Sequence, residues 1–353
     1  MPLDWWQQGE MWAWADKEGL AATIWSQYHA LGDEAQQGAI KSAMLAEVRH
    51  AKAEYMHQRF ALAKILKAMN AASIPVICMR GKAVAEDLYT PSFLRGSTDI
   101  DLLYHEDDGP VLKQILTDSL GFSVSPKYPE MFLRDELPID LHTEPLGITR
   151  ILAWEHITPL RAPDFFEHSQ QGEMAGEKAL LVHPRVNLPY LCFHALKHSF
   201  ERLIWLYDIA LLANKVSEDD MWDEVLAGIQ AYKLERPCYY VLAYVQAHLA
   251  AQVPDEILQT IQPKMGFFER RLFKRHMQHE SIPFLAERLF SLMQPSLKHR
   301  LEFWRETIYP RYEVRKQIAG CGCVKCNFIR KRLKQVGSAL WGLTKELFSI
   351  ARA

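Results

Sequence analysis

The sequence predicts an α+β protein in which a small mixed β-sheet is embedded between an N-terminal and a C-terminal helical region. Apolar residues recur at three- and four-residue spacings up to residue 72 and again beyond about residue 180. Between these regions, short apolar runs bounded by turn-forming residues are typical of strands. With 353 residues and 49% hydrophobic content, the chain suits about two domains. We expect helices over 1–72, an α/β core over 73–180 and helices over 181–353.

The expected elements follow a simple order. The helical spacing breaks at 71–75, and the apolar run 76–79 predicts a buried strand. Helical spacing then covers 82–89 until Thr90-Pro91 stops it. Further strands are expected at 99–103, 122–124, 131–133 and 138–142, with a helix at 109–120. From about Lys178 onward the spacing predicts mostly helix.

Charge and hydropathy give no support to some classes of protein. The net charge of −2 gives no global electrostatic reason to expect nucleic acid. The N-terminus lacks the basic start and apolar run of a signal peptide, and no stretch reaches the roughly 18 apolar residues of a membrane span. We therefore expect a cytoplasmic protein without a transmembrane segment, and nothing in the sequence specifies its oligomeric state.

Three carboxylates are the most informative candidates for chemistry. Asp99 and Asp101 flank Ile100, and Asp140 follows in the run 138–142. Side chains alternate along a strand, so the carboxylates of each run share one face. Oxygen ligands suit Mg²⁺ or Mn²⁺, and a pair of such ions can clamp both oxygens of an in-line phosphoryl displacement. The alternative is a solvated turn, which the apolar neighbours Ile100 and Leu102 disfavour.

A strand, a glycine and a helix start together predict an anion site beside these carboxylates. The free amides at a helix N-terminus favour phosphate, and glycine permits its close approach. Basic and hydroxyl side chains lie around this junction and just before the acidic pair. The predicted nucleotide-binding residues are Arg80, Gly81, Lys82, Arg95 and Ser97.

Six cysteines do not form a disulfide framework in a chain of this length. Cys321, Cys323 and Cys326 offer three thiolates that a soft metal such as zinc could use with a fourth ligand. No second Cys/His pair at a familiar spacing accompanies them, so redox or fortuitous thiols are favoured over zinc. The remaining three are expected to be small core residues: Cys78, Cys192 and Cys238.

A second polar group lies on the predicted helices after residue 184. His194 and His198 are four residues apart, but Ala195 stands where a zinc protease has glutamate, which excludes that class. We expect these histidines, with Arg202 and Asp208, to fix the helices against the core. The alternative is that His198 or Arg202 reaches the nucleotide or the acceptor as an accessory residue.

Taken together, the segments 79–89, 94–95, 97–103 and 139–142 resemble the bacterial family labelled uncharacterised nucleotidyltransferase. This family lies within the DNA polymerase β-type superfamily. The segment from His194 to Asp208 is also similar to the helical part of that family, and the likeness covers roughly residues 5 to 215. His142, which ends the last motif, is a further accessory candidate.

The resemblance implies a small mixed sheet and the transfer of a nucleoside monophosphate from a nucleoside triphosphate (NTP) to an acceptor. It implies that Asp99 and Asp101 bind two divalent ions, that Asp140 completes the site and helps to deprotonate the acceptor, and that amides near Gly81 meet the triphosphate. Two positions depart from the expected pattern: Lys82 follows the glycine where the superfamily usually has Gly or Ser, and Arg80 replaces the Lys that is more usual in the family. All three acidic positions are filled, which favours an active enzyme.

Two other functions remain open at this point. One is a non-catalytic nucleotide-binding or assembly module with the same fold. The other is a glycosyltransferase that uses Asp-x-Asp with a sugar nucleotide, which predicts that Asp140 lies away from the pair. The acceptor of a nucleotidyltransferase could be a small molecule, a protein or an RNA.

Overall fold

The fold is taken from a computed structural model that describes residues 10–30, 39–147, 151–280, 282, 284–319 and 329. Its α-helices, several of them short, are α2 (Glu10–Lys17), α3 (Ala21–Ala30), α4 (Ala39–Ala71), α5 (Arg80–Leu88), α6 (Gly109–Gln114), α7 (Ala162–Glu167), α8 (Pro184–Lys197), α9 (Leu203–Glu218), α10 (Trp222–Ala231), α11 (Glu235–Leu249), α12 (Asp255–Ile261), α13 (Phe267–Met277), α14 (Leu285–Met293), α15 (Leu297–Ile308) and α16 (Tyr312–Ala319). Its strands are β1 (Val76–Met79), β2 (Ile100–Tyr104), β3 (Ser123–Val124), β4 (Met131–Arg134), β5 (Leu137–His142), β6 (Ser169–Met174) and β7 (Glu177–Val182). Short helical turns are η2 (Ser92–Leu94), η3 (Glu106–Asp108), η4 (Ile115–Ser119) and η5 (Leu152–His156). The predicted α+β class is confirmed.

The main sheet has five strands in the order β1-β2-β5-β4-β3. β2 and β5 are parallel, and the other neighbouring pairs are antiparallel. β1 and β2 are buried along their whole length, which explains their continuous apolar runs. β5 alternates between buried and half-buried residues. The register places Asp101 directly beside Asp140, so the topology brings the predicted carboxylates together.

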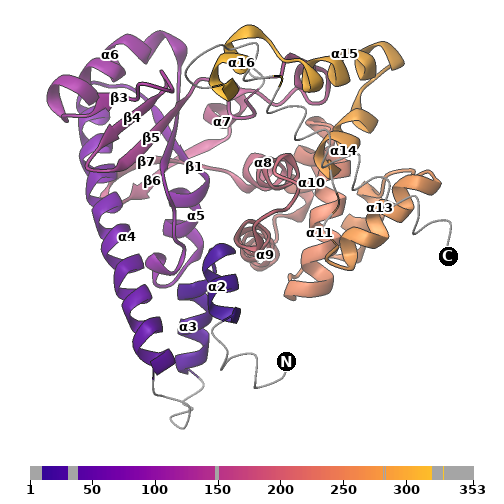
Figure 1. The fold of residues 1–353 in the computed structure, drawn as a ribbon, viewed down its shortest axis with the longest axis horizontal. Coiled ribbons are helices and arrows are strands. Elements are labelled where there is room, and N and C mark those ends of the chain that lie inside the picture. The colour runs from indigo at the N-terminus through magenta and orange to yellow at the C-terminus, as the bar shows by residue number, and fades with distance from the viewer. Residues whose placement is uncertain are drawn as a thin grey trace.

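Helices cover both sides of this sheet. In Figure 1, the long helix α4 runs along one side of the sheet, and α8 to α14 gather on the other side of the molecule. The contact with α4 is apolar: Leu62, Ile65, Leu66 and Met69 are almost fully buried in one cluster with the sheet. Burying such a side chain contributes roughly 1.5–3 kcal/mol. This packing fixes the sheet and the loops that follow its strands.

One predicted element differs. The helix expected from Lys178 is a strand, because Ala175 and Gly176 both adopt positive φ and turn β6 back into β7. Two consecutive residues with positive φ are typical of tight hairpin turns. β7 then packs against α4 and β1, and the helical region begins with α8 at Pro184. The domain divisions at 72 and 180 stay predictions.

Cys78, Cys192 and Cys238 are buried, as predicted. The cluster Cys321, Cys323 and Cys326 lies outside the described residues. Among the described helices, none combines the length and apolarity needed to cross a bilayer.

Candidate active site

The predicted carboxylates meet at the start of β2 and in the middle of β5. Asp101 and Asp140 are register partners, and Asp99 stands just before β2 on the same face as Asp101. Donor atoms of Asp101, Asp140 and His142 lie within 4.8 Å of one another. Asp99 is outside that group but lines the same cavity. His142 belongs to this face because it lies two residues after Asp140 on β5.

Arg80 balances the negative charge of this group. It is the first residue of α5, directly after β1, and its φ of 52° turns the chain there. Its guanidinium forms an ion pair with Asp101, and its Nη2 lies 2.9 Å from His142 Nε2. Nη1 is 3.4 Å from Nδ1 of His194 on α8. A predicted nucleotide-binding residue thus contacts one of the carboxylates, Asp101.

The carboxyl groups differ in their acidity. Burial and the neighbouring Asp101 raise the pKa of Asp99 to about 6. Burial also raises the pKa of Asp140. Burial acts in the same direction on Asp101, but the charges and hydrogen bonds of Arg80 and His142 outweigh it and hold the pKa of Asp101 below its usual value. The group therefore carries closely spaced negative charge, which a divalent cation would stabilise.

Gly81 allows the loop before β2 to lie against the first turn of α5. A Cβ at Gly81 would stand 2.5 Å from Ser97 Oγ and 3.0 Å from Arg95 Nη1. Ser97 Oγ in turn donates to the carbonyl of Asp99 at 2.8 Å. Arg95 donates through Nε and Nη2 to Asp208 of α9. The glycine is therefore required by close packing between two segments that border the carboxylates.

Lys82 takes a different direction from the other predicted nucleotide contacts. It is only 1% exposed, and its Nζ lies 4.0 Å from the centre of the Tyr55 ring on α4. Burial lowers its pKa to about 8. Lys82 does not line the cavity that the described residues enclose around the carboxylates, whereas Arg80, Gly81, Arg95 and Ser97 do.

The start of the C-terminal helical region forms the opposite wall. His194, His198, Arg202 and Trp205 all line the cavity. The two histidine rings lie 4.8 Å apart, and both pack near Trp205. Burial lowers the pKa of His194 well below its usual value, so this imidazole is neutral beside the Arg80 guanidinium. The contact between Arg80 and His194 leaves no signal in the sequence, because it depends on tertiary packing.

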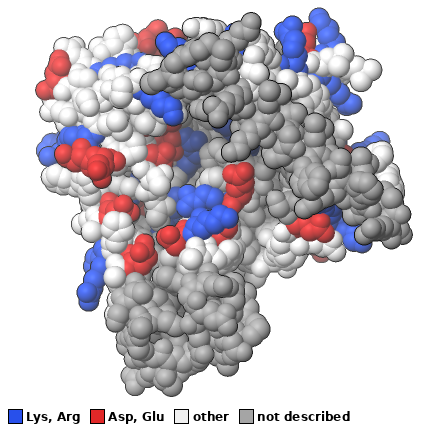
Figure 2. All heavy atoms as spheres, in the orientation of Figure 1, with Lys and Arg blue, Asp and Glu red and all other residues white. Residues whose placement is uncertain are grey.

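The cavity has a volume of about 1210 Å³. Small-molecule sites usually measure about 300–1,000 Å³, so this one has room for a nucleotide together with a second substrate. Carboxylates outnumber lysine and arginine side chains in its lining. Among the described residues in Figure 2, charged side chains of both signs surround the hollow in the middle of the face.

A small mixed sheet with carboxylates on two adjacent parallel strands, beside a glycine at a helix start, defines a nucleotidyltransferase-like class of protein. The chain belongs to the family described as uncharacterised nucleotidyltransferase, whose model matches residues 6–250. Among solved structures, it is similar to the solution structure of the antibiotic-resistance factor ANT(2'')-Ia at 16% identity and a TM-score of 0.35, covering 55% of this chain and 98% of that one. No curated protein matches the chain.

Proposed function

We propose that this protein transfers a nucleoside monophosphate from an NTP to a hydroxyl-bearing acceptor with the help of two divalent ions. The observation that carries the proposal is the register pairing of Asp101 with Asp140, with Asp99 beside them in one cavity. The family match supports the same activity.

The donor set fits Mg²⁺ or Mn²⁺. Asp101, Asp140 and His142 already place their donor atoms within 4.8 Å of one another, and Asp99 adds a carboxylate to the same cavity. Such ions, when bound, neutralise phosphate charge and lower the pKa of a hydroxyl. Asp99, Asp101 and Asp140 would hold them, and the Arg80 guanidinium would then be free to pair with phosphate.

The proposed reaction has one chemical step, and the side chains of the cavity would each support part of it. The acceptor oxygen attacks the α-phosphorus, the bond to the leaving pyrophosphate breaks, and the hydroxyl proton passes to Asp140. The amides after Gly81 and the hydroxyl of Ser97 would contact the phosphates. Arg95 would act by positioning the loop, since its Nη1 donates to the carbonyl of Gly96 at 2.7 Å. Lys82 stays a predicted contact.

The competing functions are less well supported. A glycosyltransferase with a lone Asp-x-Asp pair would leave Asp140 apart, yet its donor atom is within 4.8 Å of that of Asp101. A non-catalytic module does not explain why three carboxylates are brought together in one cavity. Because the cavity lining is rich in carboxylates, a small neutral or cationic acceptor suits it better than a protein or an RNA end.

The test compares wild type with Asp101→Asn and Asp140→Asn. Wild-type protein with Mg²⁺ or Mn²⁺ should bind an NTP saturably and release pyrophosphate when a cellular small-molecule extract supplies the acceptor. Each variant should abolish pyrophosphate release. The matched control is Asp135→Asn, an exposed acid in the turn between β4 and β5, which should behave as wild type. A wild-type protein without saturable NTP binding in either metal would refute the proposal.

A further inference from the structure

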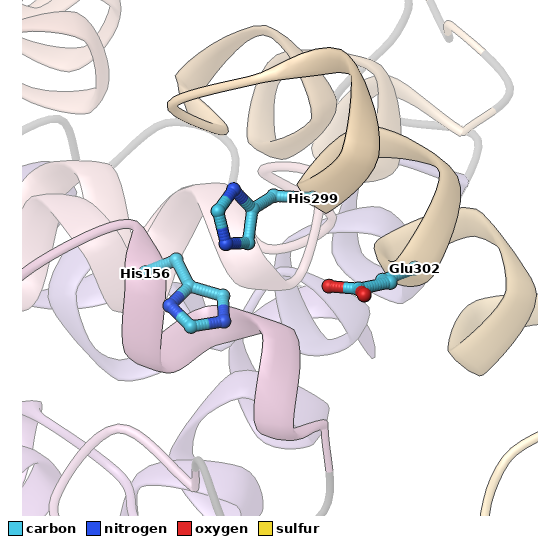
Figure 3. A group of neighbouring side chains, drawn as sticks. All are labelled: His156, His299 and Glu302. Atoms are coloured by element: carbon cyan, nitrogen blue, oxygen red, sulfur yellow. The ribbon is translucent and has the colours of Figure 1, made fainter.

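A second group of metal-ligating side chains lies apart from the cavity. His156, His299 and Glu302 place one donor atom each within 4.8 Å of one another. Figure 3 shows two imidazole rings and the carboxylate around a common space. None of these residues lines the cavity around the catalytic carboxylates. The group is therefore separate from the proposed catalytic site.

Two elements that are distant in sequence supply the group. His156 ends η5, whereas His299 and Glu302 are three residues apart on α15 and so share one face of that helix. The ring centroids of His156 and His299 lie 4.3 Å apart. An aromatic contact alone would account for the two rings, but it does not account for the carboxylate that faces the same space.

Hydrogen bonds outside the group hold η5 and α15 together. The amide of Ala153 in η5 donates to Glu306 of α15 at 2.9 Å. The carbonyl of Ala153 accepts from Gln294, just before α15, at 2.9 Å. These hydrogen bonds hold η5 and α15 at a fixed distance, so the spacing of the three donor groups does not depend only on the conformations of His156, His299 and Glu302. Such support from neighbouring residues is what a preorganised metal site requires.

His299 also has an outer partner of the kind found at metal sites. Ser296, the N-cap of α15, has its Oγ 2.8 Å from His299 Nδ1. This contact orients the ring and leaves Nε2 as the nitrogen available to an ion. Ligating histidines almost always have their second nitrogen engaged in this way. Ser296 would therefore fix the imidazole before an ion arrives.

We propose that His156, His299 and Glu302 form a binding site for a divalent transition ion, Zn²⁺ in the first instance. Two imidazoles and one carboxylate suit zinc, and three protein ligands with water in the fourth position complete a tetrahedral site. Mg²⁺ would bind there poorly, because it prefers oxygen ligands in octahedral geometry.

The ion would join α15 to a segment that borders the catalytic cavity. Trp154 of η5 packs with its ring centre 5.1 Å from Nζ of Lys197. Lys197 lines the cavity, and its Nζ donates to the carbonyl of Leu146 at 3.4 Å. Fixing η5 therefore fixes part of the cavity wall, which gives the site a stabilising role for the enzyme.

Titration of the full-length, metal-free protein with ZnCl₂ tests the site. Zinc can also bind to the catalytic carboxylates and the thiols at 321–326. The informative quantity is therefore the difference in bound zinc between wild type and each variant. His299→Ala and Glu302→Gln should each lose one equivalent of bound zinc and the zinc-induced rise in melting temperature, with unchanged circular dichroism. The matched control is His57→Ala, an exposed histidine on α4, which should retain both.

The absorption spectrum of bound Co²⁺ supplies an independent test of the ligands. Its visible d–d bands report a low coordination number, whereas a thiolate site adds a charge-transfer band in the near ultraviolet. Glu302→Gln should change the d–d bands and leave any charge-transfer band intact. Equal zinc stoichiometry and an equal melting-temperature rise in wild type, His299→Ala and Glu302→Gln would overturn the proposal. Loss of all bound zinc in Asp101→Asn alone would do so as well.

Discussion

The ion pair between Arg95 and Asp208 joins the sheet region to α9, and replacing Asp208 by Asn should destabilise the whole protein. Both side chains are less than 10% exposed. Asp208 accepts hydrogen bonds from Nε and Nη2 of Arg95 and one from the Tyr89 hydroxyl at 2.7 Å. The variant leaves a buried guanidinium without its counter-charge. Removing one partner of a buried ion pair costs about 3–5 kcal/mol.

A matched control is a second ion pair that also involves α9. Lys215 of α9 pairs with Asp87 of α5, but both side chains are more than a third exposed. Exposed pairs contribute at most about 1 kcal/mol, so Asp87→Asn should change stability little. Urea unfolding, followed by tryptophan fluorescence and circular dichroism, gives the free energy of unfolding for each variant.

A double variant tests whether the unpaired buried charge causes the loss of stability. With Arg95→Met added to Asp208→Asn, both charges of this pair are removed, so the double variant should lose less stability than the two single variants together. Equal losses from Asp208→Asn and Asp87→Asn would refute the argument that burial sets the cost. So would strict additivity of the single variants.

Three further predictions concern other parts of the molecule. Gly228→Ala should lower the free energy of unfolding in urea by about 3 kcal/mol or more, because the new Cβ would stand 2.1 Å from the backbone carbonyl oxygen of Arg185. The control Gly266→Ala, with open space around it, should be nearly neutral, and a similar loss of stability in both variants would contradict this. Lys82→Met should raise the free energy of unfolding at pH 7 by about 2 kcal/mol, because a buried ammonium is removed. Since burial lowers the pKa of Lys82 to about 8, this gain in stability should shrink as the pH rises above 8. A gain that does not depend on pH would be inconsistent with this cause. Burial lowers the pKa of His276 to about 4, so the neutral imidazole supports the fold at pH 7. The free energy of unfolding should therefore fall by on the order of 3 kcal/mol between pH 6.5 and pH 4. His276→Phe should remove this part of the pH dependence, and an unchanged pH profile in the variant would contradict the prediction.

The grouping of the three carboxylates follows largely from local patterns in the sequence. Alternation along β2 and β5 places Asp99, Asp101 and Asp140 on one face, and the apolar residues between them mark buried strands. His142 follows from the same alternation, since it stands two residues after Asp140. What a single sequence could not specify was the parallel register that puts Asp101 beside Asp140.

Other features were missed for physical reasons. The run 177–182 has a composition that suits a helix, and it becomes β7 because of the turn at Ala175 and Gly176 and because it packs on α4 and β1. The inward direction of Arg80 depends on a positive φ, which is uncommon for a residue with a side chain. Contacts made by residues far apart in the chain, such as His156 with His299, leave no periodic signal in a sequence.

The first helices of the C-terminal region belong to the candidate active site. Asp208 of α9 holds Arg95, and Arg95 in turn donates to the loop that leads into Asp99. His194 of α8 lies against Arg80, which pairs with Asp101. Each of the two arginines beside the carboxylates is therefore positioned from outside the sheet. This dependence gives a physical reason why the family match continues to residue 250, well beyond the sheet itself.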